Sequence, residues 1–133
     1  MIKNKSFTHW SEQWNAKIVL FVGEFSEMNA FLLKKFRYED NSHTQNPNFS
    51  GEAFTIINYD QSVVAHVIWM PAFSFKTHDY VTLTHEVIHT ASRILDDRGV
   101  VYNDPAKEAL TYTVDNIYGA FLKKLHKEYD KNG

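Results

Sequence analysis

Residues 81–95 read VTLTHEVIHTASRIL, and the fold of the C-terminal half of the chain depends on them. Apolar side chains recur in this stretch at intervals of three and four residues, which is the spacing of one face of an amphipathic helix. The side chains with this spacing are those of Val81, Val87, Ile88, Ala91, Ile94 and Leu95. We therefore predict a helix over residues 81–95, with Gly99 closing the helical region.

Two strands are expected before this helix. Residues 53–59 and 62–70 are rich in β-branched and aromatic side chains and are separated by Asp60 and Gln61. Such a pair of runs predicts a β-hairpin. Pro71 ends the second strand because proline cannot donate a backbone hydrogen bond.

The N-terminal part predicts a strand followed by a helix. Residues 16–22 form a short apolar run that ends at Gly23, as a buried strand would. Residues 24–36 carry apolar side chains at helical spacing and basic residues near the end. Residues 38–51 are polar and contain Pro47, which predicts a long surface loop.

A last helix is expected to start at Asn103, Asp104 and Pro105, since proline is tolerated in the first turn. It should run to about Tyr129, with residues 127–133 as a charged, frayed tail. The predicted element order is β-α-β-β-α-α. We thus expect an α+β fold with a small, mostly antiparallel sheet, an active-site helix and a C-terminal helix.

The composition and charge of the chain limit the classes of function that it could have. With 133 residues the chain is expected to form a single domain, residues 1–133. Its formal charge of -2 disfavours nucleic acid as a partner, and its longest apolar run is too short to span a membrane. We find no signal-peptide pattern at the start and expect a cytoplasmic location. Because the chain has no cysteine, any metal must be held by His, Asp or Glu.

His85, Glu86 and His89 match the pattern H-E-x-x-H within the predicted helix. Residues four apart on a helix differ by about 40° in azimuth, so both imidazoles can point at one ion. Glu86 could then reach a water on that ion and act as a general base. The alternative is that both histidines are merely solvated and Glu86 is a surface charge.

A catalytic zinc site normally has three protein ligands, so a further ligand is needed. Asp96 and Asp97 are expected to face solvent. Glu108, nineteen residues after His89, could reach the pair if the next helix returns antiparallel. It is our leading third ligand, although a carboxylate near a helix N-terminus is also favoured by the helix dipole alone.

These residues resemble the zincin metallopeptidases of the gluzincin type, in which an H-E-x-x-H helix is followed by a helix that donates a Glu. More narrowly, they resemble small metallopeptidases encoded by phages and prophages. The resemblance covers roughly residues 80–121. It implies that His85, His89 and Glu108 bind Zn²⁺ and that Glu86 is the general base. In the larger gluzincins a carboxylate follows the ligand Glu by four residues, whereas this chain has Tyr112 there.

The expected function is zinc-dependent hydrolysis of peptide bonds in a peptide or protein substrate. Tyr112, His78 and Tyr102 are candidates for the donor that stabilises the oxyanion, and we include Tyr112 among the catalytic residues. Tyr112 or Asp115 could instead orient a ligand histidine. The alternative function is a phage or prophage regulatory or virion-associated protein that binds zinc without peptidase activity. The sequence leaves the metal, among Zn, Mn, Co and Ni, and the oligomeric state open.

Overall fold

The computed structural model describes residues 1–39, 50–101 and 103–132. In this part of the chain it contains four strands and three helices in an α+β arrangement. All six predicted elements are present in the predicted order, and one further strand precedes them. The elements are β1 (Lys5–Ser11), β2 (Ala16–Val22), α1 (Phe25–Phe36), β3 (Glu52–Ile57), β4 (Val63–Met70), α2 (Thr77–Asp97) and α3 (Asp104–Asn132).

The strands form one sheet in the order β1-β2-β4-β3. β2 and β4 are parallel, with Leu20 opposite Ile68, while the other two pairs are antiparallel. The sheet is therefore mostly antiparallel, as predicted. β4 lies inside the sheet between β2 and β3, so the second strand of the predicted hairpin offers no free edge, and β3 is an edge strand of the described sheet.

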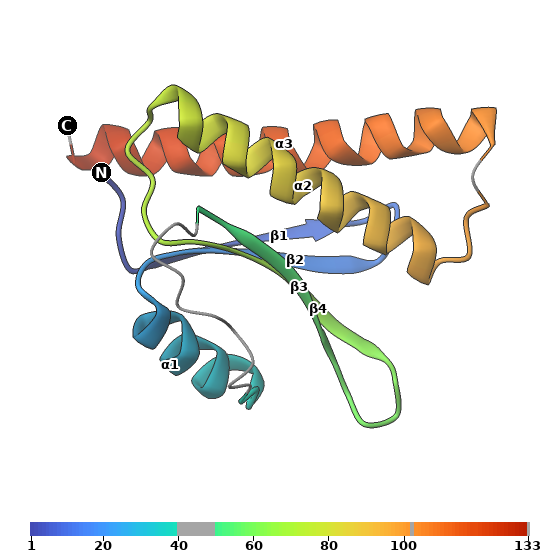
Figure 1. The fold of residues 1–133 in the computed structure, drawn as a ribbon, viewed down its shortest axis with the longest axis horizontal. Coiled ribbons are helices and arrows are strands. Elements are labelled where there is room, and N and C mark those ends of the chain that lie inside the picture. The colour runs from blue at the N-terminus through green and yellow to red at the C-terminus, as the bar shows by residue number, and fades with distance from the viewer. Residues whose placement is uncertain (40–49, 102, 133) are drawn as a thin grey trace.

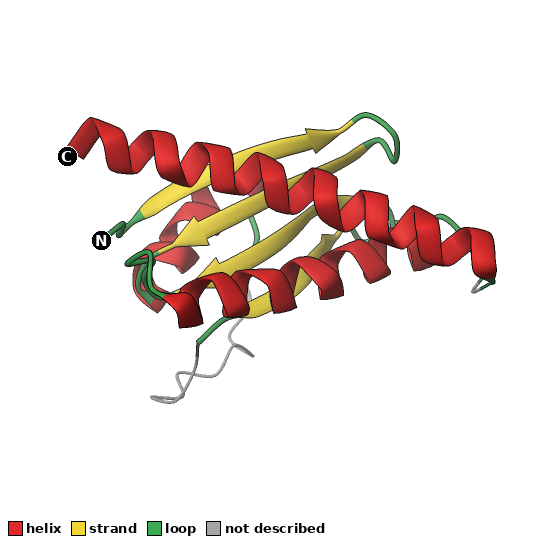
Figure 2. Cartoon of the chain, turned by 90° about the horizontal axis from the view of Figure 1, so that it is seen from above, coloured by secondary structure: helices red, strands yellow, loops and turns green. Residues whose placement is uncertain are grey.

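Helices cover both faces of the sheet. Figure 1 shows α1 on one face and the two long helices α2 and α3 on the other, and Figure 2 shows α2 and α3 running over the strands. α3 contacts β1, whereas α2 contacts β3 and β4. The central strand β2 is consequently buried on both sides, with Leu20 in the core under α2 and α3 and Phe21 in the core under α1.

β1 is the strand that the sequence analysis missed. Its sequence KSFTHWS is mostly polar, and only Phe7 and Ser11 are buried. It pairs antiparallel with β2 across a short turn, where Asn15 has a positive φ of 51°. His9 and Lys5 contact α3 through Asn116 and Glu128. Partners distant in sequence therefore hold this strand in place.

The two long helices extend beyond their predicted bounds. α2 begins at Thr77, four residues early, because the Asp79 carboxylate accepts hydrogen bonds from the backbone N–H groups of Ser74 and Lys76. α3 begins as predicted, with Asn103 Oδ1 accepting a bond from the N–H of Ala106. It continues to Asn132, so residues 127–132, expected to be frayed, are helical.

Two further predictions concern the loop at residues 38–51 and a possible membrane span. The loop predicted for residues 38–51 lies almost wholly outside the described residues. Among the described helices, we find none with a segment of the length and apolar character needed to cross a bilayer.

Candidate metal centre

The two histidines of the H-E-x-x-H pattern meet on the exposed side of α2. The Nε2 atoms of His85 and His89 are 3.0 Å apart, and the rings stand edge to face with their centroids 4.6 Å apart. The His85 side chain is 67% exposed, and His89 is also exposed. The predicted convergence of the imidazoles is present, and their nitrogens are open to a ligand from outside the chain.

Glu86 has very different surroundings from the histidines beside it. The residue is buried, and its Oε1 lies 3.8 Å from His85 Nε2. Burial raises the pKa of the Glu86 carboxyl, and the nearby His85 and His89 partly oppose that rise. A carboxyl with this raised proton affinity, next to two imidazoles, suits a general base.

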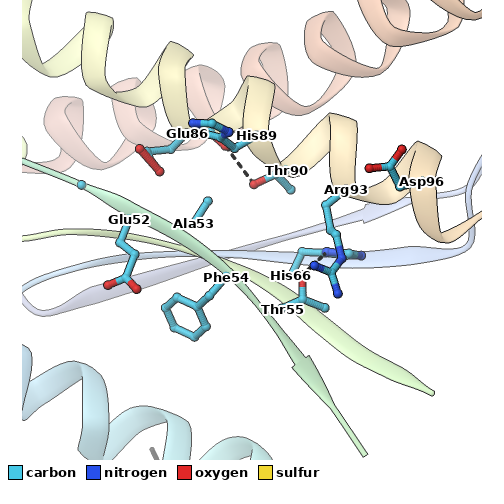
Figure 3. Close-up of a pocket in the computed structure, with 11 residues that line it drawn as sticks. Glu52, Ala53, Phe54, Thr55, His66, Glu86, His89, Thr90, Arg93 and Asp96 are labelled. Carbon is cyan, nitrogen blue, oxygen red and sulfur yellow. Dashed lines mark hydrogen bonds between the residues drawn. The ribbon is translucent and has the colours of Figure 1, made fainter. Parts of the chain in front are cut away.

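A cleft of about 490 Å³ separates this part of α2 from the edge strand β3. Figure 3 shows Glu86, His89, Thr90, Arg93 and Asp96 of α2 facing β3 across it, with His66 of β4 in its wall. The chain enters β3 close to the helix, because a Cβ added to Gly51 would lie 2.7 Å from Thr82 Cγ2 and 3.3 Å from Glu86 Cγ. Glycine at this position lets the strand approach Glu86 closely.

The far end of the cleft contains residues that the sequence gave little reason to select. His66 is buried, and its Nδ1 lies 3.1 Å from the Thr55 hydroxyl. Its Nε2 lies 4.0 Å from Asp97 Oδ2, and the same carboxylate pairs with Arg93 at 3.3 Å. Burial lowers the pKa of His66, with Asp97 opposing the shift, so the imidazole is held neutral. Alternation along β4 was the only signal in the sequence that could have placed His66 on this face.

The packing of α3 on α2 determines where Glu108 lies. The Tyr80 hydroxyl is 3.3 Å from His126 Nε2, so the start of α2 meets the last third of α3. At the other end, Arg98 donates to the carbonyl of Asn15. Trp14, in the same β1–β2 turn, donates from Nε1 to Thr113 Oγ1 at 2.8 Å. Figure 1 shows α2 and α3 running in opposite directions, and the β1–β2 turn contacts both Thr113 of α3 and Arg98 directly after α2.

Glu108 lies near the start of α3, which begins at Asp104. His89 lies in the middle of α2, nine residues before Arg98, which corresponds to about 14 Å of helix rise. Glu108 is exposed, and its Oε1 accepts a hydrogen bond from the Tyr112 hydroxyl at 3.2 Å. The helices return antiparallel as expected, but the structure does not bring Glu108 to the histidine pair.

The predicted oxyanion donors do not gather at the pair either. Tyr112 is 60% exposed and lies beside Glu108 on α3, and Asp115 is exposed on the same helix. His78 is exposed on the first turn of α2, with Nε2 3.2 Å from Asp79 Oδ1. Tyr102 lies outside the described residues. Asp96 and Asp97 were expected to face solvent, and both are exposed; Asp96 also lines the cleft and Asp97 pairs with Arg93.

The histidine pair fits two positions of a zinc site. Two nitrogens bound to one tetrahedral zinc at about 2.0–2.1 Å lie about 3.3–3.4 Å apart. The observed separation of 3.0 Å needs only a small change of rotamer to reach that value. A third ligand is missing, because no three His, Cys, Asp or Glu side chains within residues 1–39, 50–101 and 103–132 form a group that could hold a metal ion.

Comparisons with known proteins leave the family of the chain undetermined. No family model matches it, and no curated protein sequence or solved structure matches it either. The resemblance to zincins therefore depends on the H-E-x-x-H pattern and its position on α2.

Proposed function

We propose that the protein is a zinc-dependent hydrolase of peptide bonds, with His85 and His89 as metal ligands and Glu86 as the general base. The observation that carries the proposal is the close arrangement of the three side chains on α2, with Glu86 and His89 lining the cleft. The histidine Nε2 atoms converge at 3.0 Å, and the carboxylate of the buried Glu86 lies 3.8 Å from one of them. This arrangement provides two ligands and a base within one turn of α2.

The chain's own residues supply the proton transfer. Bound zinc would supply Lewis acidity to a water molecule and to the scissile carbonyl. The Glu86 carboxylate accepts the proton of the attacking water and passes it to the nitrogen of the leaving amine. Burial raises the pKa of Glu86 and so favours the protonated form that delivers the proton.

The edge strand β3 supports a peptide as the substrate. It borders the cleft opposite Glu86 and His89, and within the described sheet it pairs on one side only, with β4. An extended peptide can add to such an edge through backbone hydrogen bonds. β4 lies between β2 and β3 and cannot accept another strand, so the proposal assigns peptide binding to β3.

A second candidate function is zinc binding without hydrolysis, as in a regulatory or virion-associated protein of a phage or prophage. The observation in its favour is the absence of a third ligand beside the pair among the described residues. Glu108, which would complete a gluzincin-like ligand set, lies elsewhere on α3 beside Tyr112. A cytoplasmic location, in the host cell if a phage encodes the chain, belongs to both proposals and suits a protein without cysteine.

The test combines metal analysis with hydrolysis assays on purified protein. Wild-type protein should contain zinc and cleave quenched fluorescent peptides from a mixed-sequence library. Glu86→Gln should retain the zinc and lose about 10²-fold or more of the activity, because general-base catalysis contributes about that much. Glu108→Gln is the matched control, since it removes an exposed carboxylate from a helix without touching the pair.

The outcomes separate the candidates. Loss of activity in Glu86→Gln with zinc retained supports the hydrolase. Bound zinc with no cleavage of any library peptide by the wild type favours the second candidate. Failure to bind zinc even on titration overturns both.

A further inference from the structure

The outer face of α2 carries exposed apolar side chains beside the histidine pair. Val81 is 63% exposed and Ile88 is 43% exposed. They lie four residues before and three residues after His85, so all three share one side of the helix. They border a hollow of about 470 Å³ whose other lining residues are Thr77, Tyr80 and Thr84. None of these six residues is Asp, Glu, Lys or Arg, so this surface, which we call the α2 outer face, carries no fixed charge.

The histidine pair lies between this surface and the cleft. His85 lines the hollow of the α2 outer face, whereas His89 and Glu86 line the cleft along β3. A ligand that contacts both imidazoles can therefore approach over the apolar side chains. The buried carboxylate of Glu86 remains on the cleft side.

One chain provides only half of a tetrahedral ligand set. The pair supplies two nitrogens, and no third His, Cys, Asp or Glu joins it within the described residues. Zinc in closed sites takes four protein ligands. A second copy related by a two-fold axis would present the same two nitrogens, because such an interface apposes the same patch from both chains.

We propose that one zinc ion joins two copies of this chain through His85 and His89 of each, with Val81 and Ile88 of both copies buried around it. This inference depends on the zinc binding proposed above. The missing ligands come from the partner copy, and the uncharged α2 outer face supplies apolar area without burying an unpaired charge. Four histidines leave no position for water, so the bridged dimer is a resting form and hydrolysis belongs to the separated chains.

The experiment measures mass and zinc stoichiometry together. The metal-free chain of residues 1–133, prepared with a chelator, should sediment as a monomer of 15.5 kDa. On titration with zinc sulfate it should become a dimer, with the mass change complete at one zinc per two chains. Addition of the chelator should restore the monomer.

Two kinds of variant test the surface and the ligands separately. Ile88→Glu places like charges across the two-fold axis and should abolish the dimer while the chain still binds zinc, more weakly and at one ion per chain. Val81→Glu should do the same and guards against a folding defect in the first variant. Leu33→Glu, on α1 and 50% exposed, is the matched control and should dimerise like the wild type. His89→Ala should lose both the dimer and the zinc.

Three results overturn the proposal. Zinc bound at one ion per chain to a wild-type monomer rejects the bridge but leaves the proposed hydrolase standing. A dimer that persists in the chelator shows that zinc does not join the chains. Absence of zinc binding rejects the bridge and the proposed function together.

Discussion

The middle of α2 and the first turns of α3 were both expected to contribute to the metal site. The candidate residues of the two regions differ in their position and burial. In α2, His85 and His89 converge at 3.0 Å and Glu86 is buried beside them. In α3, Glu108 is exposed, and its carboxylate accepts a hydrogen bond from Tyr112 of its own helix. The middle of α2 brings its candidate residues together, whereas Glu108 is exposed near the start of α3.

The difference shows which geometry a sequence pattern can predict. Spacing within one helix fixes how its side chains lie relative to one another, because the rise and the turn per residue are constant. The position of one helix along another depends on contacts that spacing does not show. Here α3 contacts α2 through Tyr80 and His126 and contacts the β1–β2 turn through Thr113 and Trp14, and Glu108 does not join the histidine pair.

The largest expected effect concerns metal affinity and tests this comparison directly. His85→Ala and His89→Ala should each weaken zinc binding by more than the about 10- to 100-fold that loss of an outer partner costs. Glu108→Ala should change it by less than about threefold, the equivalent of the ~0.5 kcal/mol typical of a surface substitution. Competition titration with a colorimetric chelator measures all three. An effect of Glu108→Ala as large as that of His89→Ala would contradict the arrangement of α2 and α3.

The sequence predicted the elements with strong periodicity and missed the one without it. α2 was recognisable from its apolar spacing, and α3 from the start signal at Asn103, Asp104 and Pro105. β1 was missed because its polar sequence gains its place from pairing with β2 and from contacts with α3. The parallel pairing of β2 with β4, which makes β4 interior, was also not visible in local patterns.

The candidate site also has features that the sequence predicted and features that it did not. The convergence of His85 and His89 was predicted, since both belong to one helix. The cleft along β3, with His66 in its wall, was not, because it brings together residues of three elements. The close approach of Gly51 to Glu86 likewise depends on how β3 meets α2.

That close approach provides the next prediction, on stability. Gly51→Ala should destabilise the protein by about 1–3 kcal/mol, because its Cβ would lie 2.7 Å from Thr82 Cγ2 and overpack the contact. Gly119→Ala is the matched control in α3, where an added Cβ meets no atom within 4 Å. It should stabilise by about 0.5–1 kcal/mol through helix propensity. Urea unfolding measures both, and equal effects would show that β3 does not approach Glu86 closely.

A smaller effect is expected from His66 at acid pH. Burial lowers its pKa in the folded chain below the ordinary value of 6.5, so the unfolded chain binds the proton more readily. The stability that neutral His66 contributes is full above pH 6.5 and is lost as the pH falls through the folded pKa. His66→Gln should flatten this decline in a series of unfolding curves. Equal slopes for wild type and His66→Gln would refute the assignment.

The smallest expected effect is on the stability of metal-free protein when Glu86 or Glu108 is replaced. Burial raises the folded pKa of Glu86 above the ordinary 4.5, although His85 and His89 oppose the rise. The stability that protonated Glu86 contributes is therefore full below pH 4.5 and is lost as the pH rises through the folded pKa. Because glutamine does not ionise, the stability of Glu86→Gln relative to wild type should increase as the pH rises above 4.5 and shrink as the pH is lowered. Glu108→Gln should differ from wild type by less than about 0.5 kcal/mol, because it replaces an exposed surface residue. If the stability of Glu86→Gln relative to wild type is no greater at pH 7 than at pH 4, the Glu86 carboxylate is well solvated. The contrast between α2 and α3 would then depend on the histidines alone.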